Sequence, residues 1–152
     1  MIYMLKDLEL HIENRIDSAL DFLIKKSFTN VNRKLISVEI KKVDSYFMAT
    51  IDNKILVSTD CSKLNNRALI GVLAHELVHV IDYQKSPIKD LLRRFFYNIP
   101  SYRTKHERRI DLEVIQRGFG EYLLEFLEYH DKYYKKYNET DGLTKNEVRK
   151  LL

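Results

Sequence analysis

Two histidines spaced four residues apart, with a glutamate directly after the first, form the most chemically distinctive pattern in the sequence. They are His75, Glu76 and His79, in the order His-Glu-x-x-His. On a helix, positions four apart differ by about 40° and one turn, so the two imidazoles would converge on one point. Neutral imidazole suits zinc, and a glutamate between the two histidines can reach a water molecule on the metal without binding the ion itself. The pattern therefore predicts a zinc site with two ligands and a general base on one helix.

The neighbouring residues favour a metal site over two isolated histidines. A pattern this short can arise by chance, but Leu73-Ala74 and Leu77-Val78 make the segment strongly apolar and place its polar side chains near a core. Burying two imidazoles and a carboxylate without partners would cost several kcal/mol. A bound cation removes that cost, so we interpret the three residues as parts of a metal site.

A third ligand is expected outside this helix, because a catalytic zinc keeps three protein ligands and leaves its fourth position for water. No His-x-x-Gly-x-x-His string follows Glu76, so a carboxylate on a second helix is the natural alternative. Glu107 and Asp111 are four residues apart and share one face of a helix expected over about 103–117. One of them can bind the metal while the other accepts the second N–H of a metal-bound imidazole.

Two further residues of the second helix remain as rival ligands. His106 adjoins Glu107 but points about 100° away from it, and Glu113 lies on a different face from Asp111. The pair Glu107 and Asp111 could otherwise be an ordinary surface pair beside two arginines.

The elements that must position these residues follow from hydrophobic periodicity. Apolar residues at steps of three and four mark helices, and strict alternation marks strands. This predicts a helix over about 4–26, a strand around 36–40, a hairpin of strands 46–51 and 54–59, a metal-binding helix capped by Asn65 or Asn66, helices over about 88–97, 103–117 and 120–137, a turn over 138–142 and a short helix from Thr144. The order of one helix, three strands and then helices predicts an α+β fold, with residues 1–152 in a single domain.

The two motifs together resemble those of the gluzincin metallopeptidases. The resemblance is strongest in residues 69–83, which carry His-Glu-x-x-His, and in residues 102–120, which carry Glu-x-x-x-Asp. The short length and the sparse order of elements are similar to the archaeal minimal gluzincins, or minigluzincins, over roughly residues 35–127. The resemblance implies a zincin-like fold with an N-terminal helix, a small three-stranded sheet, an active-site helix and C-terminal helices.

Carried over by position, the resemblance also implies a role for each site residue. His75, His79 and Glu107 would bind Zn²⁺, Glu76 would be the catalytic general base, and Asp111 would hold a ligating histidine from behind. The protein would then be a zinc metalloendopeptidase that hydrolyses peptide bonds through a zinc-activated water molecule.

The resemblance suggests how substrate binding and regulation would work. In zincins a strand above the active-site helix pairs with an extended substrate. Residues 54–59 directly precede that helix and are the candidate strand, although an ordinary hairpin strand is an equal alternative. Minimal gluzincins are thought to be kept latent by their C-terminal tails. Residues 138–152, with the apolar Val148, Leu151 and Leu152, are a candidate regulatory tail that would occupy the cleft or else pack as an ordinary helix.

Composition and charge exclude several other classes of protein. The net charge of +4 comes from basic residues spread along 152 residues, unlike the clustered basic face of a nucleic-acid binder. The single cysteine, Cys61, rules out an internal disulfide and suits a reducing compartment. It could approach the zinc as an inhibitory ligand, although a small buried residue is the simpler interpretation. The N-terminus reaches charged residues before any long apolar stretch, so we expect no secretory or membrane-spanning segment.

We therefore expect a cytoplasmic zinc peptidase, active or latent, with a peptide or protein substrate and with neither nucleic acid nor a membrane as partner. The alternative is a zinc-bearing protein of zincin fold without turnover, acting as a binding or regulatory module. A third interpretation is a basic helical protein that binds nucleic acid, in which the histidine motif is accidental. Metal content separates the third interpretation from the others, and peptide cleavage separates the first two.

Overall fold

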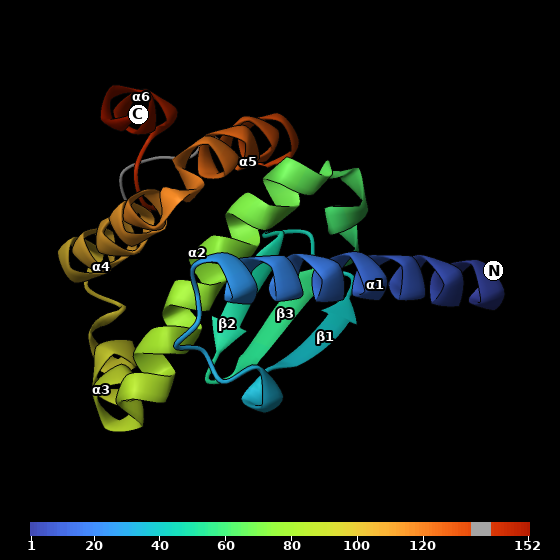
Figure 1. Cartoon of the computed structure of the whole chain (residues 1–152), viewed down its shortest axis with the longest axis horizontal. Helices are drawn as coiled ribbons and strands as arrows, with labels where there is room; N and C mark the ends of the chain where they lie inside the picture. Colours follow the sequence, from blue (N-terminus) through green and yellow to red (C-terminus); the bar gives the residue numbers. More distant parts are fainter. Residues whose placement is uncertain (135–140) are drawn as a thin grey trace.

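The computed structural model describes residues 1–134 and 141–152, which form an α+β arrangement of helices around one small sheet (Figure 1). The helices are α1 (Ile2–Lys26), α2 (Asn66–Lys85), α3 (Pro87–Phe96), α4 (Pro100–Val114), α5 (Gly120–Tyr133) and α6 (Lys145–Leu151). The strands are β1 (Ser37–Lys41), β2 (Met48–Ile51) and β3 (Lys54–Ser58). Short helical turns lie at Arg33–Leu35, Thr59–Lys63 and Ile115–Phe119. The predicted α+β class and order of elements are confirmed.

The three strands form a mixed sheet in the order β1-β3-β2. β2 and β3 are the predicted hairpin, joined antiparallel across Asp52-Asn53, and Asp52 takes the left-handed backbone conformation (φ 58°) that this tight turn requires. β1 runs parallel to β3, with Val38 opposite Ile55.

This strand order corrects the expected position of the substrate-binding strand. Residues 54–59 were the candidate, but β3 lies between β1 and β2, so both of its edges are already paired. Its continuous buried run, Ile55 to Ser58, is typical of a central strand. β2 is the strand beside α2, and within the described residues it pairs only with β3.

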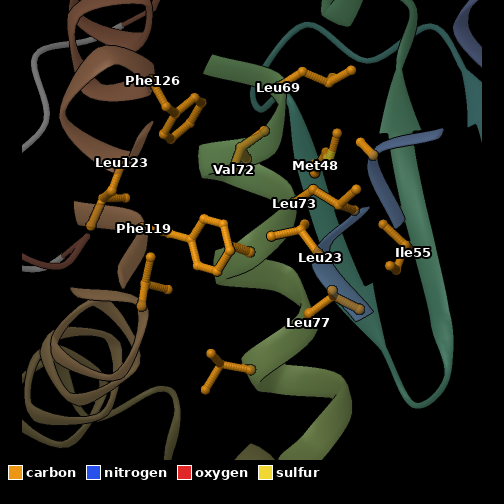
Figure 2. Close-up of a cluster of buried hydrophobic side chains, with 14 of the residues drawn as sticks. Leu23, Met48, Ile55, Leu69, Val72, Leu73, Leu77, Phe119, Leu123 and Phe126 are labelled. Carbon is orange, nitrogen blue, oxygen red and sulfur yellow. The ribbon is translucent and has the colours of Figure 1, made fainter. Parts of the chain in front are cut away.

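Helix α2 lies at the centre of the molecule and is apolar on most of its circumference. The side chain of Asn65 caps it by accepting a hydrogen bond from the backbone N–H of Ala68. Figure 2 shows Leu69, Val72, Leu73 and Leu77 of α2 between two layers. The layers are Met48 and Ile55 of the sheet on one side, and Phe119, Leu123 and Phe126 on the other. Helix α2 is therefore fixed from both sides by the core.

Two glycines have specific roles in placing α4 and α5 against α2. A Cβ on Gly71 would lie 2.2 Å from the carbonyl oxygen of Tyr122, so the close approach of α2 and α5 requires glycine. Gly118 has a φ of 91° and turns the chain between α4 and α5. From the sequence, the helix expected over about 103–117 was predicted to stop at this glycine.

The last helix is packed against the body. Thr144 caps α6 in a reciprocal capping box with Glu147, and Val148 is fully buried in the core. The helix expected over 120–137 ends at Tyr133, and residues 135–137 lie outside the described part of the chain, as do residues 138–140 of the expected turn. No helix in residues 1–134 or 141–152 is both long and apolar enough to cross a membrane.

Candidate metal centre

The structure brings together two histidines of α2 and one glutamate of α4. The Nε2 atom of His75 lies 3.0 Å from Oε2 of Glu107 and 3.3 Å from Nε2 of His79. The Nε2 atom of His79 lies 3.5 Å from the same oxygen of Glu107. Four-coordinate zinc with bonds of 2.0–2.1 Å needs donor atoms about 3.3 Å apart, the edge of the corresponding tetrahedron. The spacing of the three donor atoms therefore fits a metal ion, and within residues 1–134 and 141–152 they are the group that could hold one.

Asp111 holds His75 in the orientation that metal binding needs. Its fully buried carboxylate lies one turn beyond Glu107 on α4, and Oδ1 is 2.7 Å from Nδ1 of His75. A carboxylate accepts from an N–H, so Nδ1 carries the proton and Nε2 of a neutral His75 presents a lone pair to the metal position. The other oxygen, Oδ2, accepts a hydrogen bond of 2.8 Å from the backbone N–H of Leu143. Asp111 thus links the metal-binding helix to the C-terminal segment.

The charged groups of the site shift one another's pKa values in opposite directions. Although burial alone would lower it, the Asp111 and Glu107 carboxylates hold the pKa of His75 well above its usual range. Burial has the opposite effect on a carboxylate and alone would raise the pKa of Glu107. Hydrogen bonds with His75 and His79 nevertheless hold that pKa well below its usual range. In the metal-free protein a proton on His75 therefore occupies the place between acceptors that a metal ion would take.

Glu76 faces the same space without belonging to the ligand group. Its side chain is only 6% exposed, on α2 between the two histidines. The hydroxyl of Thr50 on β2 donates a 2.7 Å hydrogen bond to Oε2 of Glu76. The carboxylate is therefore held in one orientation by the neighbouring strand, as a group that takes up a proton must be.

An open cleft of about 520 Å³ gives access to these residues from solvent. Its floor contains His75, Glu76, His79 and Glu107, and β2 contributes all four of its residues to the wall. The charged face of α3 and the N-terminal half of α4 form the remaining walls with Asp90, Arg93, Arg94, Tyr97, Arg103 and His106. An extended chain lying along β2 would therefore pass over the metal position.

Tyr97 is a site residue that the sequence did not single out. Its hydroxyl donates a short hydrogen bond to Oε1 of Glu107, which leaves Oε2 of that carboxylate to face the histidines. Burial and the Glu107 charge raise the pKa of Tyr97, so the hydroxyl stays protonated as a donor. The signal in the sequence that could have identified Tyr97 is its position ten residues before Glu107, at the turn between α3 and α4. Thr50 was also missed, because its role depends on which edge of the sheet faces α2.

Neither rival ligand belongs to the group that could hold a metal ion. Glu113 forms ion pairs with Arg109 and Arg117, at 3.1 and 2.9 Å, away from the two histidines. His106 lines the cleft, but it is not in the ligand group. Burial, followed by the charge of His79, lowers the pKa of His106 to about 4, so its ring is neutral at pH 7.

Cys61 is a buried residue outside the group of His75, His79 and Glu107. Its side chain is fully buried, and its thiol donates to the backbone carbonyl of Phe47. Burial raises the pKa of this thiol to about 12, which disfavours the thiolate that would bind zinc. The simpler interpretation of Cys61 as a buried packing residue is therefore supported.

The described part of the C-terminal tail supports the site from behind. Val148 lies in the core, and neither Leu151 nor Leu152 lines the cleft, so the apolar end does not occupy it. Asp141 is the residue of 141–152 that reaches the cleft wall, 3.8 Å from Arg103. Residues 138–140 of the candidate regulatory tail lie outside the described residues.

Comparison of the chain with protein-family models, with curated proteins and with solved structures finds no significant match. The assignment of a function to this chain therefore rests on the site itself.

Proposed function

We propose that this protein is a zinc-dependent metallopeptidase of the gluzincin type. The observation that supports it best is the convergence of His75, His79 and Glu107 on one point, beside the carboxylate of Glu76 in the same cleft. Two imidazoles and one carboxylate suit zinc, whereas magnesium and calcium prefer oxygen ligands throughout. The two motif helices and the cleft between them and the sheet also favour a zincin-like fold.

The proposed chemistry needs few groups from the chain. Bound by His75, His79 and Glu107, zinc would lower the pKa of a water molecule to about 7 and polarise the scissile carbonyl. Glu76 would accept the proton of the attacking water as general base and later donate it to the nitrogen of the leaving amine. Thr50 donates to Oε2 of Glu76, so the proton would be carried on Oε1.

We assign substrate binding to β2 in place of the strand expected from the sequence. An extended peptide can add to a sheet edge through main-chain hydrogen bonds, which do not depend on the side chains of the peptide. β2 lines the cleft along its whole length, and the same strand supplies Thr50 to the general base. Strand addition here would carry the scissile bond past Glu76.

The buried thiol of Cys61 suits a reducing compartment, and we place the enzyme in the cytoplasm. Its substrates would then be cytoplasmic peptides or proteins, cleaved internally.

Cleavage of a mixed peptide library by the zinc-loaded protein tests this proposal. We expect the wild-type chain to cleave, and Glu76→Gln to retain zinc while losing cleavage by a factor of 100 or more, about the contribution of a general base. Glu113→Gln is the matched control, because it makes the same change on a glutamate outside the cleft and should leave cleavage intact. A wild-type protein that binds zinc but cleaves nothing would favour the binding or regulatory module instead. A wild-type protein without stoichiometric zinc would contradict both.

A further inference from the structure

Helix α3 differs from an ordinary surface helix in which of its sides faces solvent. Surface helices normally bury their apolar side and expose their charged side. In α3 no residue is buried, and its large apolar side chains are exposed. Together with Ile99 they are 48–74% exposed: Ile88, Leu91, Leu92, Phe95, Phe96 and Ile99. Their spacing of three and four residues places them on one continuous stripe of the helix and the turn after it.

The opposite side of α3 is bound to the body by ion pairs. Arg94 contacts Asp52 of the hairpin turn and Asp90 one turn earlier on the helix. Arg93 lies 3.3 Å from Asp82 of α2. These contacts fix the rotation of the helix, so the exposure of the apolar stripe is a consequence of how α3 is held.

A basic side chain borders the apolar stripe on one side. At about 100° per residue, Lys89 lies roughly 20° beyond Phe96, and its side chain is exposed. Arg94 lies roughly 60° beyond Leu91 on the other side, where it is paired with Asp52 and Asp90. Residues 85–105 carry six basic and one acidic side chain, a net charge of +5 against +4 for the whole chain. The segment that contains α3 is therefore basic, although Arg93, Arg94 and Arg103 in it are paired with aspartates.

From this arrangement we infer that α3 is a docking surface for an anionic lipid membrane, with the helix lying in the plane of the interface. A short helix with Leu and Phe on one face and Lys and Arg beside it is the pattern of interfacial membrane helices. The exposed Lys89 at one border complements anionic headgroups, and its long side chain can extend to them while the apolar stripe enters the acyl region.

This inference departs from the sequence-based expectation of no membrane partner, and it does not depend on the metal centre. A membrane on this face would lie beside the cleft, because Asp90, Arg93 and Arg94 on the other side of α3 line the cleft wall. The substrate-binding side would then be held close to the lipid surface.

Co-sedimentation of the full chain with lipid vesicles tests the inference. We expect binding to vesicles of equimolar phosphatidylcholine and phosphatidylglycerol, weaker binding to phosphatidylcholine alone, and a decrease with added salt. Leu92→Gln, at a leucine 53% exposed on α3, should weaken binding by about tenfold, because an apolar side chain no longer enters the bilayer. Leu10→Gln, at a leucine 55% exposed on α1, is the matched control and should bind like wild type.

The charged border is tested separately. Lys89→Gln should weaken binding to the anionic vesicles by about fivefold and leave binding to phosphatidylcholine unchanged, whereas Lys150→Gln on α6 should change neither. Leu92 and Lys89 are both exposed, so circular dichroism of the two α3 variants should show that their folding is unchanged. Wild-type protein that does not bind the anionic vesicles, or equal losses in the Leu92 and Leu10 variants, would overturn the inference. Light scattering that shows a lipid-free dimer, dissociated by Leu92→Gln, would assign the stripe to a second copy and also overturn it.

Discussion

Replacing Asp111 with asparagine removes one carboxylate oxygen from between two buried N–H donors. In the native site Oδ1 faces Nδ1 of His75 at 2.7 Å, and Oδ2 faces the backbone N–H of Leu143 at 2.8 Å. The asparagine side chain has one oxygen and one NH₂ group, so it can accept from one donor only and must turn its NH₂ towards the other. Since the side chain is fully buried, water cannot replace the lost acceptor.

The size of the effect follows from the bond that is lost. A hydrogen bond to a charged group contributes about 1.5–3 kcal/mol, and tenfold in affinity corresponds to about 1.4 kcal/mol. His75 would lose the partner that fixes its tautomer and strengthens Nε2 as a ligand. We therefore expect Asp111→Asn to weaken zinc binding by about 10–100-fold, the range usual for carboxylates behind a ligating histidine.

Competition with a chromophoric zinc chelator measures this change directly. Glu113→Gln is the matched control, because it makes the same carboxylate-to-amide change two residues further along α4 and outside the ligand group. Circular dichroism of both metal-free variants checks that each remains folded. If Asp111→Asn binds zinc like wild type, or if Glu113→Gln is the weaker binder, our assignment of the α4 faces is wrong.

Three further experiments test other parts of the structure. Tyr97→Phe removes the hydroxyl that holds Glu107 and should weaken zinc binding by about tenfold in the same chelator assay, whereas an unchanged affinity would remove Tyr97 from the site. The fully buried Cys61 should resist a thiol reagent at pH 8 and react after unfolding, and rapid reaction in the native protein would contradict its burial. Gly71→Ala places a methyl group against the backbone of Tyr122 and should lower the melting temperature by roughly 3–10 °C, as scanning calorimetry would show.

Local patterns in the sequence predicted most of the elements, and they predicted which of the candidate residues lie together. The spacing of His75 and His79 on an apolar helix predicted two converging imidazoles, and their Nε2 atoms lie 3.3 Å apart. Glu107 and Asp111 were assigned by their shared face and by the resemblance, and each lies against His75 at hydrogen-bond distance. Such inferences succeed because residues on one face of a helix keep a fixed relation that does not depend on the rest of the fold.

The parts that the sequence did not predict depend on contacts between distant elements. The hairpin of β2 and β3 was expected, but the pairing of β1 with β3 determines which strand is left at the edge, and no local pattern specifies it. Thr50 was missed for this reason. The position of α6 was uncertain because its single buried residue, Val148, gives a weak periodic signal. The exposed stripe of α3 could not be foreseen, because an amphipathic pattern alone predicts a buried apolar face.

X-ray absorption at the zinc edge of the purified wild-type chain tests the central claim most directly, since it reports the ligands as well as the metal. We predict one zinc per chain, with nitrogen and oxygen neighbours at about 2.0–2.1 Å and the scattering pattern of two imidazole rings. The imidazole contribution should fall by half in any zinc retained by His79→Ala. A chain that holds no zinc after loading, or a zinc with a sulfur neighbour at about 2.3 Å, would contradict a metal centre built from His75, His79 and Glu107.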